Sequence, residues 1–307
     1  MNQINFDGNS GVSIRPEVAE RWLDVERECP GNPAAVHTTG RKAQAIIQEA
    51  RGEISSILNC TPQEIFFTSG ATEANNWAIF SFAKQYGKKT QIYISQAEHP
   101  SCIAPARELE ARGYKVCWLP LDPYAKISSN KIKNNVKCPS LIIGQWVNQE
   151  TGTIQNVYDF AELNKKNDLF WHCDGVQGFG KIKLSAAVTS SNTLAVSGHK
   201  IGAPKGIGLL RVKDDMQMSA LILGGGQQSN LRSGTESPAL ISSLALALKL
   251  ANSEQTAFEQ RTKNIKKNYN QVTNILFLLF RKYKNKNHIK NFLLCKDNFP
   301  KETYKIP

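Results

Sequence analysis

Short apolar runs alternate with helix-length amphipathic segments from about residue 46 to residue 250, and this alternation restricts the possible fold most strongly. Helical patterns include Thr72–Gln85, Pro100–Arg112 and Val157–Asn167. Because strands that are apolar almost throughout are buried on both faces, the pattern predicts an α/β fold, with a mainly parallel seven-stranded sheet between helices. The predicted strands are Ile65–Thr68, Gln91–Ser95, Lys115–Leu119, Leu141–Val147, Phe170–Asp174, Thr193–Ser197 and Gly208–Val212.

The pattern changes beyond the last predicted strand. Residues 237–252, SPALISSLALALKLAN, predict a buried helix, and the following residues predict a longer amphipathic helix to about Arg281. We therefore expect a large domain at residues 15–249 and a partial, α+β small domain formed by residues 1–14 and 250–307. The chain ends soon after the second helix, so we expect the C-terminal part of the small domain to be missing.

The charge is unevenly distributed along the 307 residues, whose formal net charge is +12. Residues 251–307 contain 12 Lys and Arg against 4 Asp and Glu, so +8 of the charge lies there. These basic residues are mixed with Asn and not with the aromatic side chains that stack on bases. A solvated helix face is the favoured interpretation, and nucleic-acid binding is the weaker alternative.

The cysteines and the apolar runs indicate the compartment. The seven cysteines are scattered and never form a C-x-x-C pair, which argues against a zinc site or a disulfide framework. The apolar run Ile275–Phe280 is too short to span a bilayer. The first ten residues have no basic segment followed by an apolar one, so no secretory signal is visible. We expect a cytoplasmic protein without a metal site or a membrane segment.

Residues 66–76, FFTSGATEANN, place a predicted strand directly before a helix. Small residues at the start of a helix, here Ala71 and Thr72, leave backbone N–H groups free to bind an anion. The alternative is a plain N-cap formed by the hydroxyl of Ser69 or Thr72.

Two further polar groups follow predicted strands. His99 lies directly before Pro100, where a histidine is either catalytic or simply a polar loop residue. Asp174 lies at the carboxyl end of a strand, with Gln177 three residues later. An acidic residue there is well placed to meet a cationic ligand, although such residues also serve as turn or cap residues.

Lys200 follows a short apolar run and Ser-Gly-His, within LAVSGHKIGAPKGIG. A partly desolvated lysine has a lowered pKa and forms a Schiff base with a carbonyl, whereas most lysines are solvated surface residues. An anion site, a strand-end acid and a reactive lysine together predict pyridoxal 5′-phosphate, an aldehyde with a phosphate and a basic ring nitrogen.

Seven segments match a known family in order over roughly residues 4–250. With these motifs the chain resembles the class V aminotransferase family, and in particular its cysteine desulfurase branch. The resemblance implies a pyridoxal-phosphate-dependent transferase of fold type I. The segments are GNPAAVHTTGRKA (31–43), EIFFTSGATEANNWAI (64–79), AEHPS (97–101), VNQETGTIQ (147–155), HCDGVQGFGKI (172–182), SGHKIGAPKGIG (197–208) and GGGQQSNLRSGTE (224–236).

The resemblance also implies site roles. Lys200 would bind the cofactor as an imine and then act as a base, and His99 would stack on the ring and assist proton transfer. Asp174 would pair with the ring nitrogen and Gln177 with the phenolic oxygen. The ring-contacting amide would come from Asn148 or Gln149. The phosphate would be held by Ala71, Thr72, Ser197, His199 and, from the partner subunit of a homodimer, Thr235.

The implied reaction converts L-cysteine to L-alanine and an enzyme persulfide, whose sulfur passes to an iron–sulfur scaffold or a tRNA-thiolation enzyme. The chain departs from the family at Gln149, where a second Asn is usual, and at FDGNSGVSIRP (6–16), which lacks Ala-Thr-Thr. It also ends before the region that carries the nucleophilic cysteine and the arginine that binds the substrate carboxylate.

We therefore expect cofactor binding with little persulfide formation. None of the seven cysteines fits the nucleophile: Cys29 lies in a loop but has no family match. The cysteines without a suitable mobile context are Cys60, Cys102, Cys117, Cys138, Cys173 and Cys295. The alternatives are an aminotransferase, a selenocysteine lyase, or a catalytically dead protein that only binds the cofactor.

Overall fold

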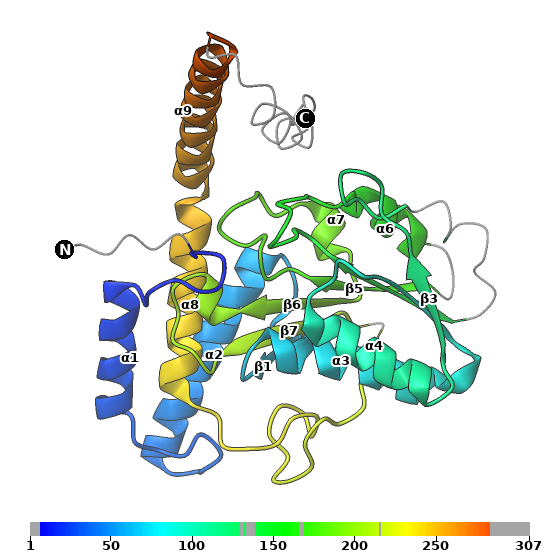
Figure 1. Ribbon diagram of the computed structural model, residues 1–307. Coiled ribbons are helices and arrows are strands. Elements are labelled where there is room, and N and C mark those ends of the chain that lie inside the picture. The colour runs from blue at the N-terminus through cyan, green and yellow to red at the C-terminus, as the bar shows by residue number, and fades with distance from the viewer. Residues whose placement is uncertain (1–6, 129–131, 133–138, 166–168, 215, 283–307) are drawn as a thin grey trace. The chain divides into compact units, whose positions relative to one another are not determined.

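The computed structural model describes residues 7–128, 132, 139–165, 169–214 and 216–282, and of residues 269–282 only the backbone (Figure 1). Contacts divide the chain into two units, Met1–Gln255 and Thr256–Pro307. Part of the predicted small domain, residues 1–6 and 283–307, lies outside the described residues, and its boundaries stay a prediction. None of the helices among the described residues has the length and the hydropathy that a membrane-spanning helix requires.

The predicted strands form one seven-stranded sheet in the order β1-β7-β6-β5-β4-β2-β3 (Figure 1). Strand β7 is antiparallel to both of its neighbours, and the other neighbouring pairs are parallel. The mainly parallel sheet of the prediction is therefore confirmed. The strands are β1 (Ile65–Thr68), β2 (Gln91–Ser95), β3 (Lys115–Leu119), β4 (Ser140–Gln145), β5 (Leu169–Asp174), β6 (Thr193–Ser197) and β7 (Gly208–Val212).

Strand β4 ends at Gln145, and the prediction that it continues to Val147 was wrong. The chain leaves the sheet where the backbone N–H of Trp146 donates to the carbonyl oxygen of Asp174 at 2.9 Å. The Asn148 side chain then accepts from the backbone N–H of Glu150 at 2.9 Å and forms a turn. A side chain that bonds its own turn competes with the strand, which explains the earlier end.

Helices cover both faces of the sheet (Figure 1). One buried cluster joins the strands to α3 and α4, and a second joins them to α2, α6, α7 and α8. The α-helices are α1 (Pro16–Glu28), α2 (Thr38–Leu58), α3 (Ala71–Tyr86), α4 (Pro100–Ala111), α6 (Val157–Asn164), α7 (Ala186–Thr189), α8 (Pro238–Ser253) and α9 (Gln255–Lys282). Single turns of 3-10 helix lie at η1 (Pro62–Glu64), η2 (Gly87–Lys89) and η3 (Gly198–Lys200).

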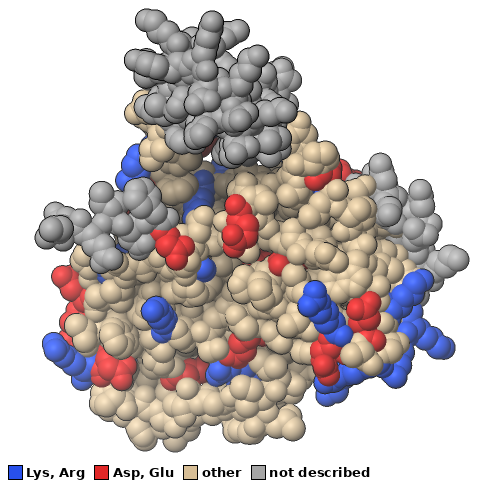
Figure 2. Space-filling view, viewed as in Figure 1, with Lys and Arg blue, Asp and Glu red and all other residues tan. Residues whose placement is uncertain are grey.

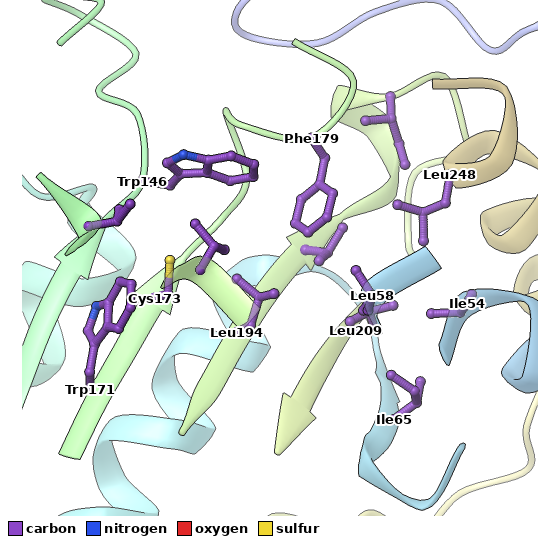
Figure 3. Packing of buried hydrophobic residues seen from close by; sticks show 14 of the residues in the cluster. Ile54, Leu58, Ile65, Trp146, Trp171, Cys173, Phe179, Leu194, Leu209 and Leu248 are labelled. Atoms are coloured by element: carbon purple, nitrogen blue, oxygen red, sulfur yellow. The ribbon is translucent and has the colours of Figure 1, made fainter. Parts of the chain in front are cut away.

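Alternate residues of each strand enter different clusters, as the pleat requires. Leu141 and Ile143 pack with α3 and α4, whereas Ile142 packs on the opposite face. Figure 3 shows Cys173 and Leu194 among the aromatic side chains of that opposite face. The Cys173 side chain therefore points away from that of Asp174, the next residue along β5.

The carboxyl ends of the parallel strands meet at one edge of the sheet. Strands β2, β4, β5 and β6 end there at Ser95, Gln145, Asp174 and Ser197. Ligands of parallel sheets bind beyond this edge, because the loops there converge from several strands.

Candidate active site

A cavity of about 710 Å³ lies at the carboxyl edge of the sheet. Most of the predicted site residues line it, although they are up to 129 positions apart in the sequence (71 to 200). The described N-terminal segment also contributes Asp7, Asn9 and Ser10. The predicted residues in the lining are Ala71, Thr72, His99, Gln149, Asp174, Gln177, Ser197, His199 and Lys200.

Helix α3 points its N-terminus at the cavity. Its N-cap residue is Gly70, which has no side chain to satisfy the N–H groups of the first turn, so the alternative prediction of a Ser69 or Thr72 cap was wrong. The first residue of strand β7, Gly208, lies close to Gly70, because a Cβ on Gly208 would be 2.7 Å from the Gly70 Cα. The free N–H groups and the helix dipole make this a site for an anion.

Ser197 and His199 lie beside this helix end. The Ser197 hydroxyl and the Nδ1 atom of His199 are 3.0 Å apart. Burial, followed by the charges of Lys200 and Lys205, lowers the pKa of His199. The imidazole is therefore suited to act as a neutral hydrogen-bond donor toward an anion.

Lys200 ends η3, directly after β6. Its Nζ atom donates to the carbonyl oxygen of Asn9 at 2.6 Å. Burial lowers the pKa of Lys200, while the charges of Asp7 and Asp174 act in the opposite direction. A lowered pKa increases the fraction of free amine, which is the nucleophilic form.

A second lysine lies close to the first. The Nζ atom of Lys181 donates to the Oε1 atom of Gln177 and, at 3.3 Å, to the Oδ1 atom of Asn9. Burial and then the charge of Lys200 lower the pKa of Lys181 to about 8. Lys181 is not among the residues that line the cavity, so Lys200 is the better placed of the two amines.

Asp174 faces the cavity from the end of β5. Its oxygens accept from the backbone N–H of Val176 at 3.1 Å and from the Asn75 amide at 2.9 Å. Burial raises the pKa of Asp174, and these hydrogen bonds with the charges of His99 and Lys200 oppose that rise. A buried carboxylate stabilised in this way attracts a cationic group of a ligand.

His99 is the N-cap of α4 and also lines the cavity. Its Nδ1 atom accepts from the backbone N–H of Ser101 at 3.1 Å. The proton of the neutral ring is therefore on Nε2, which leaves an aromatic face and a donor for the cavity.

Two predicted residues do not line this cavity. The Asn148 side chain donates to the carbonyl oxygen of Ala97 at 2.7 Å and holds its own turn, whereas Gln149 does line the cavity. Thr235 follows the glycine-rich loop 224–234 and is absent from the lining. The loop is anchored within its own chain, since Arg232 pairs with Glu73 at 2.9 Å.

None of the cysteines that the structure describes lines the cavity. Cys102 and Cys173 are buried, and burial raises the pKa of both thiols well above the usual range. Burial also raises the pKa of Cys60 to about 11. Cys138 and Cys295 lie outside the described residues.

Sequence reasoning missed several polar residues around the site. Asn9 contacts Lys200, and Asn75 contacts Asp174. Helix and strand periodicity could have indicated two such residues, Asn75 and His172. Asn75 lies one helical turn after Ala71, and His172 shares a strand face with Asp174. Asn9 carried no such signal, because only the tertiary fold brings residue 9 to residue 200.

Figure 2 shows the basic side chains of one face lying among acidic ones, without a continuous basic surface.

Comparisons with known proteins agree on one family. The family model described as "Aminotransferase class-V" matches residues 4–296. "Cysteine desulfurase IscS" of Clostridium botulinum is 33% identical over 266 residues, which cover 86% of this chain and 67% of that protein. "Cysteine desulfurase IscS" of Rickettsia bellii is 36% identical over 267 residues, which cover 85% of this chain and 64% of that protein. The chain thus spans about two thirds of the length of these curated relatives.

Solved structures show the same likeness. A structure entitled "NIFS-LIKE PROTEIN" has a TM-score of 0.79 at 32% identity and covers 83% of this chain and 71% of its own. "SspA in complex with cysteine" has a TM-score of 0.77 at 32% identity and covers 85% of this chain and 78% of its own.

Proposed function

Because this chain belongs to the class V aminotransferase family, and its relatives include cysteine desulfurases, we propose that it binds pyridoxal 5′-phosphate and acts on L-cysteine. The observation that carries the proposal is one cavity in which a partly buried lysine, a buried carboxylate and an uncapped helix N-terminus converge. These groups match the aldehyde, the ring nitrogen and the phosphate of the cofactor.

The residues present fit this cofactor. The N–H groups of Ala71 and Thr72, with Ser197 and His199, would hold the phosphate at the start of α3. Asp174 would hold a proton on the ring nitrogen, and the Gln177 amide would donate to the phenolic oxygen. Gln149 lines the cavity where Asn148 does not, and so the Gln149 amide, and not that of Asn148, would be available to the ring.

When bound, pyridoxal 5′-phosphate supplies an aldehyde for imine formation and an electron sink for the α-carbon of an amino acid. Lys200 would hold the cofactor through Nζ, and its free amine would serve as the base for the proton on the α-carbon. His99 would lie against the ring and move a proton at Nε2. Asp7, Asn9 and Ser10 would restrict access of water from the N-terminal side.

We further propose that sulfur leaves the site only when a thiol reaches it from outside the cavity lining. Among the described cysteines, none is in that lining, and the raised pKa values disfavour the thiolates of Cys60, Cys102 and Cys173. Since the thiolate is the attacking form, these residues are poor acceptors. A protein that binds the cofactor without forming persulfide is therefore the second candidate.

A homodimer and a cytoplasmic sulfur acceptor, an iron–sulfur scaffold or a tRNA-thiolation enzyme, complete the proposal. The support for the homodimer is that Thr235 does not line the cavity of its own chain. A second copy of the chain would supply Thr235 to this cavity across a two-fold interface.

Absorbance spectroscopy and borohydride reduction test the central proposal. The protein with pyridoxal 5′-phosphate should turn yellow, and reduction should fix the cofactor on Lys200, as read by peptide mass spectrometry. Lys181→Ala is the matched control, because Lys181 is a nearby amine with a lowered pKa, and it should still be labelled at Lys200. Labelling of Lys181, or an unchanged imine in Lys200→Ala, would refute the assignment.

Desulfurisation is measured separately as alanine release from L-cysteine. We expect little release alone and more when a small thiol such as dithiothreitol is added as acceptor. Stoichiometric persulfide on the protein without added thiol would contradict the proposed lack of an internal acceptor.

A further inference from the structure

A chain of buried polar side chains lies behind the cavity and connects β6, β5, α3 and α4. Its members are Thr193, His172, Asn75, Ser101 and Asp174, and each is at most 7% exposed. Because buried polar atoms are almost always hydrogen-bonded, the donor and acceptor at each contact can be assigned.

The Asn75 amide is the centre of this network. Its Nδ2 atom donates to the Oδ2 atom of Asp174 at 2.9 Å and to the Oγ atom of Ser101 at 2.8 Å. An ionised carboxylate only accepts, so the amide nitrogen, and not its oxygen, must face Asp174. The backbone N–H of Val176 holds the other carboxylate oxygen at 3.1 Å. These two donors together fix the plane of the carboxylate.

His172 fixes the amide from the other side. Its Nε2 atom lies 3.0 Å from the Oδ1 atom of Asn75 and must therefore carry the ring proton. Its Nδ1 atom then accepts from the Thr193 hydroxyl at 2.8 Å. Burial lowers the pKa of His172 to about 3, so the ring stays neutral at physiological pH, and the Asn75 oxygen, which can only accept, keeps the ring proton on Nε2. His172 thus serves as a fixed donor, not as an acid or a base.

The same amide acts on His99. Since the Ser101 hydroxyl oxygen accepts from Asn75, its hydrogen is directed to the Nδ1 atom of His99, 2.7 Å away. The backbone N–H of Ser101 donates to the same atom. The proton of the neutral His99 ring is thereby kept on Nε2. One amide consequently orients two groups that face the cavity, a carboxylate and an imidazole.

We propose that Asn75, held by His172, is a positioning residue that aims the Asp174 carboxylate into the cavity and sets the direction of hydrogen bonding at His99. The link to catalysis rests on the proposed function, because it assumes that Asp174 meets the ring nitrogen of the cofactor. The network itself involves only residues of this chain, and so it can be tested without cofactor.

The first experiment uses cofactor-free protein labelled with ¹⁵N-histidine. Long-range ¹H–¹⁵N spectra should show His172 as a single Nε2–H tautomer that does not titrate between about pH 5 and 8, the range in which an ordinary histidine changes charge. Asn75→Ala should shift the ring signals of His172 and His99. Asn76→Ala is the control, since this neighbour donates only to backbone carbonyl oxygens and should leave His172 unchanged.

A His172 ring that carries its proton on Nδ1, or that titrates in this range, would overturn the assignment. Unchanged His99 signals in Asn75→Ala would overturn the link between the amide and His99.

The second experiment measures the dissociation constant and the absorbance spectrum of bound pyridoxal 5′-phosphate. Asn75→Ala and His172→Leu should weaken binding by about tenfold or more, because each loosens a hydrogen bond to a charged group. His172→Gln should stay within about threefold of the natural protein, since a glutamine amide can also donate to Asn75 and accept from Thr193. This conservative variant keeps the test decisive if His172→Leu does not fold.

If Asn75→Ala binds pyridoxal 5′-phosphate with the same affinity and the same absorbance spectrum as the natural protein, Asn75 has no positioning role. If the unchanged protein forms no imine with pyridoxal 5′-phosphate, the proposed function fails instead, and the cofactor-free spectra still decide on the network.

Discussion

Substitution of Gln228 should destabilise the protein out of proportion to its size. Strand β1 is at the edge of the sheet, so one side of its backbone has no neighbouring strand among the described residues. There the Gln228 side chain accepts from the backbone N–H of Phe67 at 2.6 Å and donates to the carbonyl oxygen of Phe67 at 2.8 Å. A single amide from the loop 224–234 thus replaces a strand partner and fastens this loop to the sheet.

Gln228→Ala removes both hydrogen bonds and leaves two buried backbone groups without partners. A buried group left unpaired costs about 1–3 kcal/mol, so we expect the free energy of unfolding to fall by about 2–4 kcal/mol. Urea unfolding followed by circular dichroism measures this difference.

Gln227→Ala is the matched control for this measurement. The Gln227 side chain accepts one exposed bond from the backbone N–H of Gly234 at 3.0 Å, so its loss should change stability by less than about 0.5 kcal/mol. A loss below about 0.5 kcal/mol in Gln228→Ala, with an unchanged urea dependence, would show that water replaces the amide and that the reasoning is wrong.

Three further predictions concern other parts of the chain. Burial raises the pKa of Glu98 well above its usual range. The stability that the protonated Glu98 side chain contributes is complete below the pKa of the unfolded chain and is lost as pH rises through the pKa of the folded protein. Glu98→Gln should therefore lessen the fall in the free energy of unfolding, measured in urea, between about pH 5 and 8. Leu194→Ala should cost about 2–5 kcal/mol because Leu194 is fully buried, whereas Leu23→Ala, at 43% exposure, should cost much less in the same assay. Because burial lowers the pKa of Lys200, borohydride labelling with pyridoxal 5′-phosphate should reach half its maximum at a lower pH for Lys200 than for exposed lysines; equal midpoints in peptide mapping would contradict this.

The sheet could be predicted from the sequence because a strand that is buried on both faces appears as a short run of mostly apolar residues. Runs such as Thr193–Ser197 are apolar almost throughout, and only a strand between two helical layers tolerates that composition. The end of β4 was less predictable, since the Asn148 side chain competes for the backbone only once the turn has formed. Element types follow from local pattern, whereas their ends depend on individual side-chain bonds.

The site residues that follow strands could also be predicted. Asp174, Ser197 and Lys200 lie at or just after the carboxyl ends of β5 and β6, and parallel strands bring such positions together whatever their distance in sequence. The anion site at α3 was visible as small residues at a helix start. The N-cap of α3 is nevertheless Gly70, and not Ser69 or Thr72, which the local sequence did not indicate.

Only the tertiary structure decided which groups control these residues. Asn75 and His172 are 97 positions apart, yet their side chains meet at 3.0 Å behind the cavity. Likewise, Asn9 contacts Lys200 because the N-terminal segment lies at the carboxyl edge of the sheet, where both residues line the cavity. Helix and strand periodicity can place a polar residue on the face of its element that meets the site, but it does not indicate which polar residue of a distant segment will pair with it. The sequence by itself therefore determined the layers and the strand-end chemistry, and the folded chain determined how that chemistry is oriented.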